Sequence, residues 1–153
     1  MTLTQKETGL LKELREQEKL CMDKYTKYSQ SACSTELKNL FSEIAGCEKK
    51  HFDTVSSMIG GTAPQIPSGG LTGENNRWCK NVGYADRRSE EIDKFLLMDC
   101  LAMEKHVSSL YDISVFEFSD TNMRKALNHI QAEEQQHGEK LYAYMNANGM
   151  YQS

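Results

Sequence analysis

The residues of this chain with the clearest chemical potential are two copies of the motif Glu-x-x-His, Glu48-x-x-His51 and Glu134-x-x-His137. On an α-helix, residues i and i+3 lie on the same face, so each motif projects a carboxylate and an imidazole in one direction. This combination of ligand types suits iron or manganese. One copy alone would be a weak signal, but the two copies belong to a longer repeat.

The repeat has an offset of 86 residues, because 134 − 48 = 86. A further glutamate precedes each motif by the same distance, since 48 − 18 = 30 and 134 − 104 = 30. Tyr25 and Tyr111 follow these two glutamates at equal spacing, because 25 − 18 = 7 and 111 − 104 = 7. The matched candidates are Glu18, Glu48 and His51 in the first copy and Glu104, Glu134 and His137 in the second.

Four glutamates and two histidines in this arrangement are the ligand set of a carboxylate-bridged di-metal site in a four-helix bundle. We expect Glu48 and Glu134 to bridge two divalent ions, either iron or manganese. Each ion would also have one terminal glutamate and one histidine, namely Glu18 with His51 and Glu104 with His137. Tyr25 and Tyr111 would face the same interior, where they could hydrogen-bond to the ligands, to water or to a bound oxygen species.

A polar network without metal is the alternative interpretation of the same residues. It would gather four carboxylates and two imidazoles in an apolar core with no cation. Raised carboxylate pKa values or protonated histidines would then have to relieve the repulsion. Metal binding is favoured because unpaired buried charges are costly. His106 and His129 have no partner in the repeat and are interpreted as surface or packing residues, and Cys21, one turn from Glu18, is interpreted as a core cysteine.

Composition limits the other classes of function. The chain has 153 residues, 39% hydrophobic and 26% charged, which fits one domain of ordinary size. The net charge of −4 and the lack of a basic stripe argue against a nucleic-acid partner. We expect no membrane span and no secretory signal, because neither apolar pattern is present. The five cysteines contain no Cys-x-x-Cys pair, so reduced thiols in a cytosolic setting are expected.

Four helices must position these ligands, and the sequence predicts them at about 5–29, 35–59, 87–117 and 121–148. Each ligand candidate lies within an apolar stripe of helical spacing, which predicts an all-α fold. Thr4-x-x-Glu7 is a capping box, Ser34 or Thr35 would cap the second helix, and Asp120 the fourth. The expected stop signals are Gly60-Gly61 and Gly149.

The segment from about 60 to 86 breaks the helical pattern with Pro64, Pro67, Gly69 and Gly70. It is too long for a hairpin, so we expect a crossover along the bundle and a third helix that starts at the same end as the second. The bundle would then consist of two helical hairpins. A simple up-down-up-down order would scatter the ligands. Trp78 and Tyr84 are expected to pin the crossover to the bundle, with a binding role as the alternative.

The duplicated ligand pattern resembles the ferritin-like superfamily, which includes rubrerythrins, bacterioferritins and manganese catalases. The second half resembles more narrowly the Coat F family, ferritin-like proteins of spore-forming bacteria that are spore coat components. The stretches that carry this narrower resemblance are LeuMetAspCysLeuAlaMetGluLysHis (97–106), Tyr111, GluGluGlnGlnHis (133–137), Tyr144-Met145 and GlyMetTyrGln (149–152). The first half shares only its ligand pattern. The whole chain would then be a single ferritin-like domain.

This resemblance implies two functions of different classes. The first is a di-iron or di-manganese oxidoreductase that acts on peroxide or dioxygen. The second is a structural spore coat protein that contacts other coat proteins and whose metal site is vestigial or merely stabilising. Iron sequestration is a weaker third possibility. A homo-oligomer, such as a dimer, is expected, with a location in the cytoplasm or the spore coat.

Overall fold

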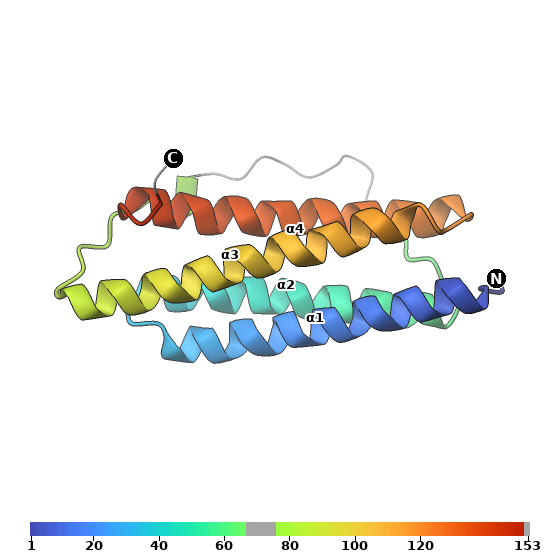
Figure 1. Cartoon of the computed structure of the whole chain (residues 1–153), viewed down its shortest axis with the longest axis horizontal. Coiled ribbons are helices and arrows are strands. Elements are labelled where there is room, and N and C mark those ends of the chain that lie inside the picture. The colour runs from blue at the N-terminus through green and yellow to red at the C-terminus, as the bar shows by residue number, and fades with distance from the viewer. Residues whose placement is uncertain (67–75, 152–153) are drawn as a thin grey trace.

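The structure is a computed structural model that describes residues 1–66 and 76–151. It contains the α-helices α1 (Gln5–Ser31), α2 (Thr35–Ile59), α3 (Arg87–Val115) and α4 (Thr121–Ala147), and a short 3₁₀-helix, η1 (Asn76–Trp78) (Figure 1). No strand occurs in these described residues, so the predicted all-α four-helix bundle is confirmed. None of the described helices is long and apolar enough to cross a membrane.

The helices begin at side chains that satisfy free backbone N–H groups. The Thr4 hydroxyl accepts a hydrogen bond from Glu7 N at 3.0 Å, and the Glu7 carboxylate accepts one from Thr4 N at 2.8 Å. This is the expected capping box. Ser34, rather than Thr35, caps α2, and Asp86 and Asp120 cap α3 and α4.

Two glycines in the left-handed region follow the ends of α2 and α4. Gly61 has φ +88°, and Gly149 has φ +67°. A Cβ atom at Gly61 would lie 2.6 Å from the carbonyl oxygen of Met1, so a side chain there would collide with the backbone. This contact places the end of α2 beside the beginning of the chain.

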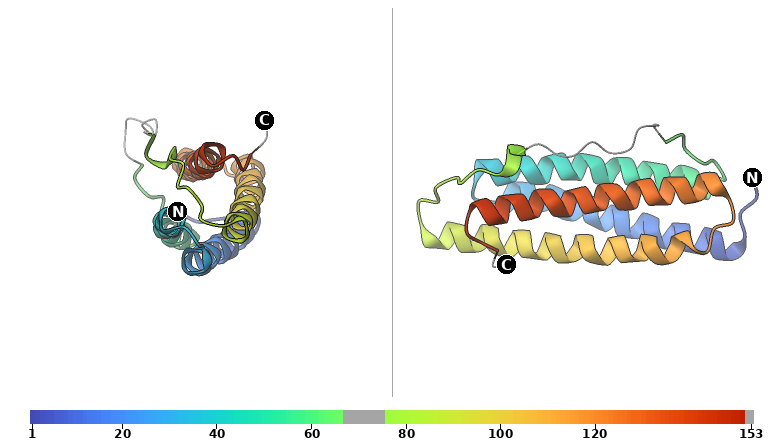
Figure 2. Two further views of the ribbon diagram at one scale, coloured as in Figure 1. Left: turned by 90° about the vertical axis from the view of Figure 1, so that its left-hand side faces the viewer. Right: turned by 90° about the horizontal axis from the view of Figure 1, so that it is seen from above.

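The other end of the bundle joins the beginnings of α2 and α3. Cys33 N and Ser34 N donate hydrogen bonds of 2.7 and 2.9 Å to the carboxylate of Asp93. The connection from 60 to 86 therefore begins at one end of the bundle and finishes at the other, and the predicted crossover is confirmed (Figure 1). Residues 67–75, which include Pro67, Gly69 and Gly70, lie outside the described residues. Seen from the end, the helices surround a common axis (Figure 2).

Trp78 and Tyr84 attach the second part of the crossover to the bundle. Trp78 is buried in an apolar cluster that includes Leu40 and Leu141. The Tyr84 hydroxyl donates to Asp93 at 2.7 Å and lies 2.7 Å from the hydroxyl of Tyr144. These contacts support the packing role for both residues.

The 86-residue repeat extends to the pattern of burial. Each buried residue of α1 and α2 has a buried counterpart 86 positions later in α3 and α4. The positions in the first hairpin are 7, 11, 14, 18, 21, 25, 37, 40, 41, 44, 48, 51, 55 and 58. Phe52, Ile59 and Leu101 are apolar residues at the edges of these stripes and are only partly buried. The two hairpins therefore pack as related halves.

Asp93 is a structural residue that the sequence did not single out. It is fully buried and accepts hydrogen bonds from two backbone amides and from the Tyr84 hydroxyl. We predict that Asp93→Ala lowers the free energy of unfolding by about 3 kcal/mol or more, because three donors lose their acceptor. Urea unfolding followed by circular dichroism measures the effect. Asp112→Ala, at an exposed position of α3, is the control, and an equal loss in both variants would contradict this role.

Candidate metal centre

The six predicted ligands meet in the middle of the bundle. α1 contributes Glu18, α2 contributes Glu48 and His51, α3 contributes Glu104, and α4 contributes Glu134 and His137. Each is at most 3% exposed. They form two groups of four, and in each group one ligand atom from every residue lies within 4.8 Å of the others. The first group is Glu18, Glu48, His51 and Glu134, and the second is Glu48, Glu104, Glu134 and His137. The shared residues are the two glutamates expected to bridge.

Both histidines direct Nδ1 toward the centre. His51 Nδ1 lies 2.7 Å from Glu134 Oε1, and His137 Nδ1 lies 2.8 Å from Glu48 Oε1. Each imidazole thus reaches the shared glutamate of the other hairpin. The two rings are stacked, with centroids 5.8 Å apart. The arrangement is nearly symmetric, as the repeat requires.

The two predicted tyrosines bind the two terminal glutamates. The Tyr25 hydroxyl donates to Glu104 Oε1 at 2.7 Å, and the Tyr111 hydroxyl donates to Glu18 Oε1 at 2.6 Å. Each bond joins one hairpin to the other and fixes one oxygen of its carboxylate. The second oxygen of each carboxylate remains directed at the cluster without a hydrogen bond from the described residues.

The cluster contains buried polar atoms that the described residues leave without a hydrogen bond. Six buried atoms make no hydrogen bond within the described part of the chain: Glu18 Oε2, both Glu48 oxygens, Glu104 Oε2, Glu134 Oε2 and His137 Nδ1. Of these, His137 Nδ1 and Glu48 Oε1 lie 2.8 Å apart as an ion pair when the imidazole is protonated. Leaving such an atom unpaired costs about 1–3 kcal/mol. Five carboxylate oxygens and an imidazole nitrogen in one place are a donor set that fits iron or manganese.

The carboxyl groups respond unequally to this crowding. Burial and the negative charge of Glu134 raise the pKa values of Glu48 and Glu104 well above the usual range. Burial also acts to raise the pKa of Glu134, but hydrogen bonds from Glu104 and His137 outweigh it and lower the pKa well below the usual range. The crowding therefore favours protonation of Glu48 and Glu104 over protonation of Glu134.

The pKa values of both histidines are raised as well. Burial acts to lower the pKa of His51, but hydrogen bonds to Cys47, Glu133 and Glu134 outweigh it and raise that pKa well above its usual value. The pKa of His137 is raised in the same way, with contacts to Cys47, Glu104 and Glu134 outweighing burial. Since a metal ligand must be deprotonated, cation binding here would release protons.

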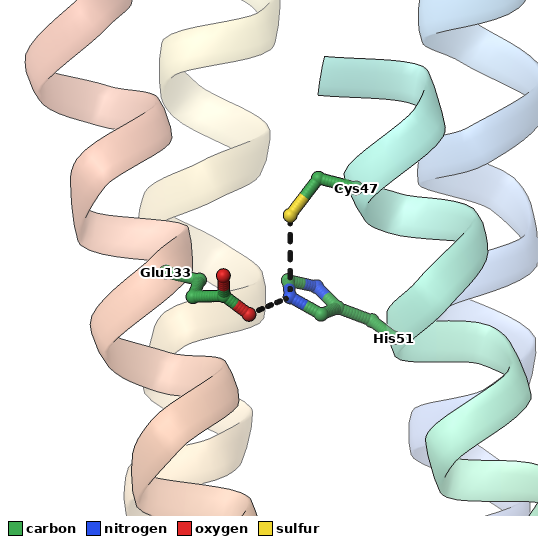
Figure 3. A group of neighbouring side chains, drawn as sticks. All are labelled: Cys47, His51 and Glu133. Carbon is green, nitrogen blue, oxygen red and sulfur yellow. Dashed lines mark hydrogen bonds and ion pairs between the residues drawn. The ribbon is translucent and has the colours of Figure 1, made fainter. Parts of the chain in front are cut away.

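Glu133 and Cys47 are neighbours of the centre that sequence reasoning missed. His51 directs its second nitrogen, Nε2, away from the centre, 3.0 Å from Glu133 Oε1 and 3.6 Å from Cys47 Sγ (Figure 3). A carboxylate on the outer nitrogen fixes the orientation of a ligating imidazole. The repeat could have identified this pair, because 133 − 86 = 47 and both residues directly precede a shared glutamate.

The cysteines near the centre differ in their chemistry. Burial acts to raise the pKa of the Cys47 thiol, but hydrogen bonds to His137 and His51 outweigh it and lower the pKa to about 7. Burial and the charge of Glu48 raise the pKa of Cys21, which therefore stays a neutral thiol. Cys21 matches the core cysteine that the sequence suggested.

Two surface pockets, each of about 230 Å³, reach the centre from different sides. One lies between α3 and α4, where Glu104, Glu134, Ser108 and Gly138 are among its lining residues. The other is formed by α2, α4 and the start of the crossover, and it leads to His51, His129 and Glu133. His129 is partly exposed, and its Nε2 lies 3.3 Å from Glu133 Oε1.

The model of the Coat F domain matches residues 92–153. The expected resemblance to the Coat F family is therefore confirmed over this segment, which contains Glu104, Tyr111, Glu134 and His137. Coat F is a family of spore coat proteins. No curated protein and no solved structure matches the chain significantly.

The tyrosine–glutamate bonds give a direct test of this geometry. We predict that Tyr111→Phe lowers the free energy of unfolding of the metal-free protein by about 2 kcal/mol, because Glu18 loses its charge-assisted donor. A double-mutant cycle with Glu18→Gln should give a coupling energy of similar size. Tyr142→Phe, at an exposed position of α4, is the matched control. A coupling energy near zero would show that the bond does not stabilise the fold.

Proposed function

We propose that this chain is a spore coat protein that holds two ions of iron or manganese at the centre of its bundle. The observation that carries the proposal is the convergence of four carboxylates and two imidazole Nδ1 atoms, with six buried atoms that make no hydrogen bond among the described residues. A purely structural core would place apolar side chains there, because an unsatisfied polar cluster lowers stability.

Each ligand has a role that follows from its contacts. Glu48 and Glu134 belong to both groups and would lie between the two ions. Glu18 with His51 would complete one set, and Glu104 with His137 the other. Tyr25 and Tyr111 hold the terminal glutamates, each through one carboxylate oxygen, and so leave the other oxygen free to ligate.

Peroxide is the substrate that we propose for this centre. Bound iron or manganese would supply redox and Lewis-acid chemistry. Two molecules of hydrogen peroxide give two of water and one of dioxygen, so one peroxide is reduced, the other is oxidised, and no external electron donor is required. Glu104 and Glu134 line the inner side of the pocket between α3 and α4, which has room for molecules of this size. The apolar clusters on both sides limit access of water.

The two halves of the repeat differ in the residues at this pocket, and the difference favours the pocket as the route by which peroxide reaches the centre. Ser108 and Gly138 line it, and the matching positions of the first hairpin are Met22 (108 − 86 = 22) and Phe52 (138 − 86 = 52). Small residues therefore stand in the second hairpin where larger ones stand in the first. A Cβ atom at Gly138 would meet Leu101 at 3.8 Å, which is ordinary contact, so a side chain can be added there.

Metal content is the first test. Protein expressed with iron or manganese is predicted to contain about two ions per chain by elemental analysis, whereas Glu134→Ala loses them and Glu139→Ala, on the exposed face of α4, keeps them. Chelation should lower the melting temperature by about 5–10 °C, because the ions bind only the folded state. An unchanged melting temperature after verified removal of metal would contradict a coupled site.

Peroxide consumption is the second test. The metal-loaded protein is predicted to release dioxygen from hydrogen peroxide, and Glu134→Ala is predicted to be inactive. Gly138→Phe should retain metal but react about tenfold more slowly, because the side chain narrows the pocket between α3 and α4. Loaded protein that consumes peroxide no faster than free ions would leave a structural role for the centre.

A second candidate function, coat assembly, rests on the outer face of α3. Four large apolar residues of α3 and its C-cap residue are exposed there, all within the segment that matches Coat F: Ile92, Phe95, Met98, Ile113 and Phe116. Phe116 is 83% exposed and Phe95 is 69% exposed. With about 100° per residue, all five lie within about a third of the helix circumference. An exposed apolar stripe of this kind marks an interaction surface.

The spacing of the stripe is self-complementary. The midpoint of 92 and 116 and the midpoint of 95 and 113 are both 104. Two copies of α3 packed antiparallel about residue 104 would place Ile92 against Phe116 and Phe95 against Ile113 of the partner. Each of these contacts would then occur twice, once from each copy, as a two-fold interface requires. We propose that this stripe pairs two copies of the chain.

Self-association tests this pairing. Sedimentation of the full chain is predicted to show a dimer that dissociates on dilution, and Phe95→Glu should shift it to monomer because the two carboxylates introduced into the dimer cannot be buried without partners. Tyr142→Glu, at a partly exposed position of α4, is the control. A wild-type chain that stays monomeric at high concentration would leave other coat proteins as the partners of the stripe.

A further inference from the structure

The outer side of His51 carries a second group of potential ligands. Cys47 Sγ and Glu133 Oε1 lie 3.6 and 3.0 Å from His51 Nε2, and the three ligand atoms all lie within 4.8 Å of one another (Figure 3). None of these atoms takes part in the carboxylate cluster, which meets His51 at Nδ1. The thiol also distinguishes this group chemically from the inner set of carboxylates and imidazoles.

Helix geometry favours chelation by these residues. Cys47 and His51 are separated by four residues on α2, and His129 and Glu133 are separated by four on α4. Residues i and i+4 project from the same face of a helix. The two pairs therefore face each other between α2 and α4, and His129 Nε2 lies 3.3 Å from the same Glu133 oxygen that contacts His51.

The distances match those between the ligands of a tetrahedral ion. With metal–sulfur and metal–nitrogen bonds of ~2.3 and ~2.0 Å, the sulfur and nitrogen atoms lie about 3.5 Å apart, and oxygen and nitrogen ligands lie slightly closer. The observed separations of 3.6 and 3.0 Å are close to these values. A pocket of about 230 Å³ opens beside His51, His129 and Glu133, so water or His129 can complete the coordination.

We propose that Cys47, His51 and Glu133 form a separate capture site for one borderline divalent cation of the zinc or cobalt type. Sulfur, nitrogen and oxygen ligands together select such ions, whereas the inner cluster suits iron or manganese. A neutral imidazole offers a lone pair on one nitrogen only, so His51 serves either the outer or the inner ion. The outer ion therefore competes with the loading of the inner centre.

Cobalt titration of the metal-free full chain tests the site. We expect a thiolate-to-cobalt charge-transfer absorption that saturates with one equivalent of Co(II) and that Zn(II) abolishes. Cys47→Ser loses this absorption, whereas Cys79→Ser, at an exposed position of the crossover, retains it. Cys21→Ser also retains it, which separates the outer site from a buried thiol near the inner cluster. Circular dichroism confirms that each variant is folded.

The cobalt absorption is expected not to depend on the inner carboxylate centre. Glu104→Ala removes a ligand from the inner group that contains His137 and leaves Cys47, His51 and Glu133 in place, so the cobalt absorption should persist. Absorption that remains in Cys47→Ser, or that disappears in Cys21→Ser, would overturn the capture site. Prior Zn(II) binding should also slow iron uptake by the wild-type chain but not by Cys47→Ser, and equal rates of uptake would contradict the competition.

Discussion

The burial of four glutamates is the constraint on which this bundle depends. Glu18, Glu48, Glu104 and Glu134 are each at most 3% exposed, and apolar clusters lie on both sides of them. Charges in such surroundings require compensation within a few ångströms. The two histidines and the two tyrosine hydroxyls supply part of this compensation through their contacts with the glutamates. Bound cations would supply the rest. These glutamates, histidines and tyrosines form a buried polar layer, and their contacts require four helices in a fixed register.

The same layer explains why the helix order matters. An imidazole of one hairpin meets the shared glutamate of the other, and a tyrosine of one meets the terminal glutamate of the other. These contacts form only if the third helix begins at the end where the second begins. The long crossover is therefore a requirement of the centre, and the hydrogen bonds from Cys33 and Ser34 to Asp93 fix that end of the bundle.

Most of the fold and the inner ligand set could be predicted because they follow a period. Helical stripes, caps and the 86-residue repeat are local or regular patterns, and burial follows the repeat closely. Asp93 could not be predicted in this way, because two of its donors are backbone amides about sixty residues away. Glu133 and Cys47 were missed because the repeat matches unlike residues there. The exposed stripe of α3 breaks the rule that apolar residues indicate the core.

The cross-hairpin bonds have a consequence for the origin of such a chain. Each hairpin carries two glutamates, one histidine and one tyrosine, and each of these side chains finds its partner on the opposite hairpin. A complete centre therefore needs two hairpins, but it does not need two different ones. A half-length ancestor that paired with itself would have assembled the same six ligands. Duplication and fusion would then have freed each half to diverge, one toward the small residues around Gly138 and the other toward the thiol of Cys47.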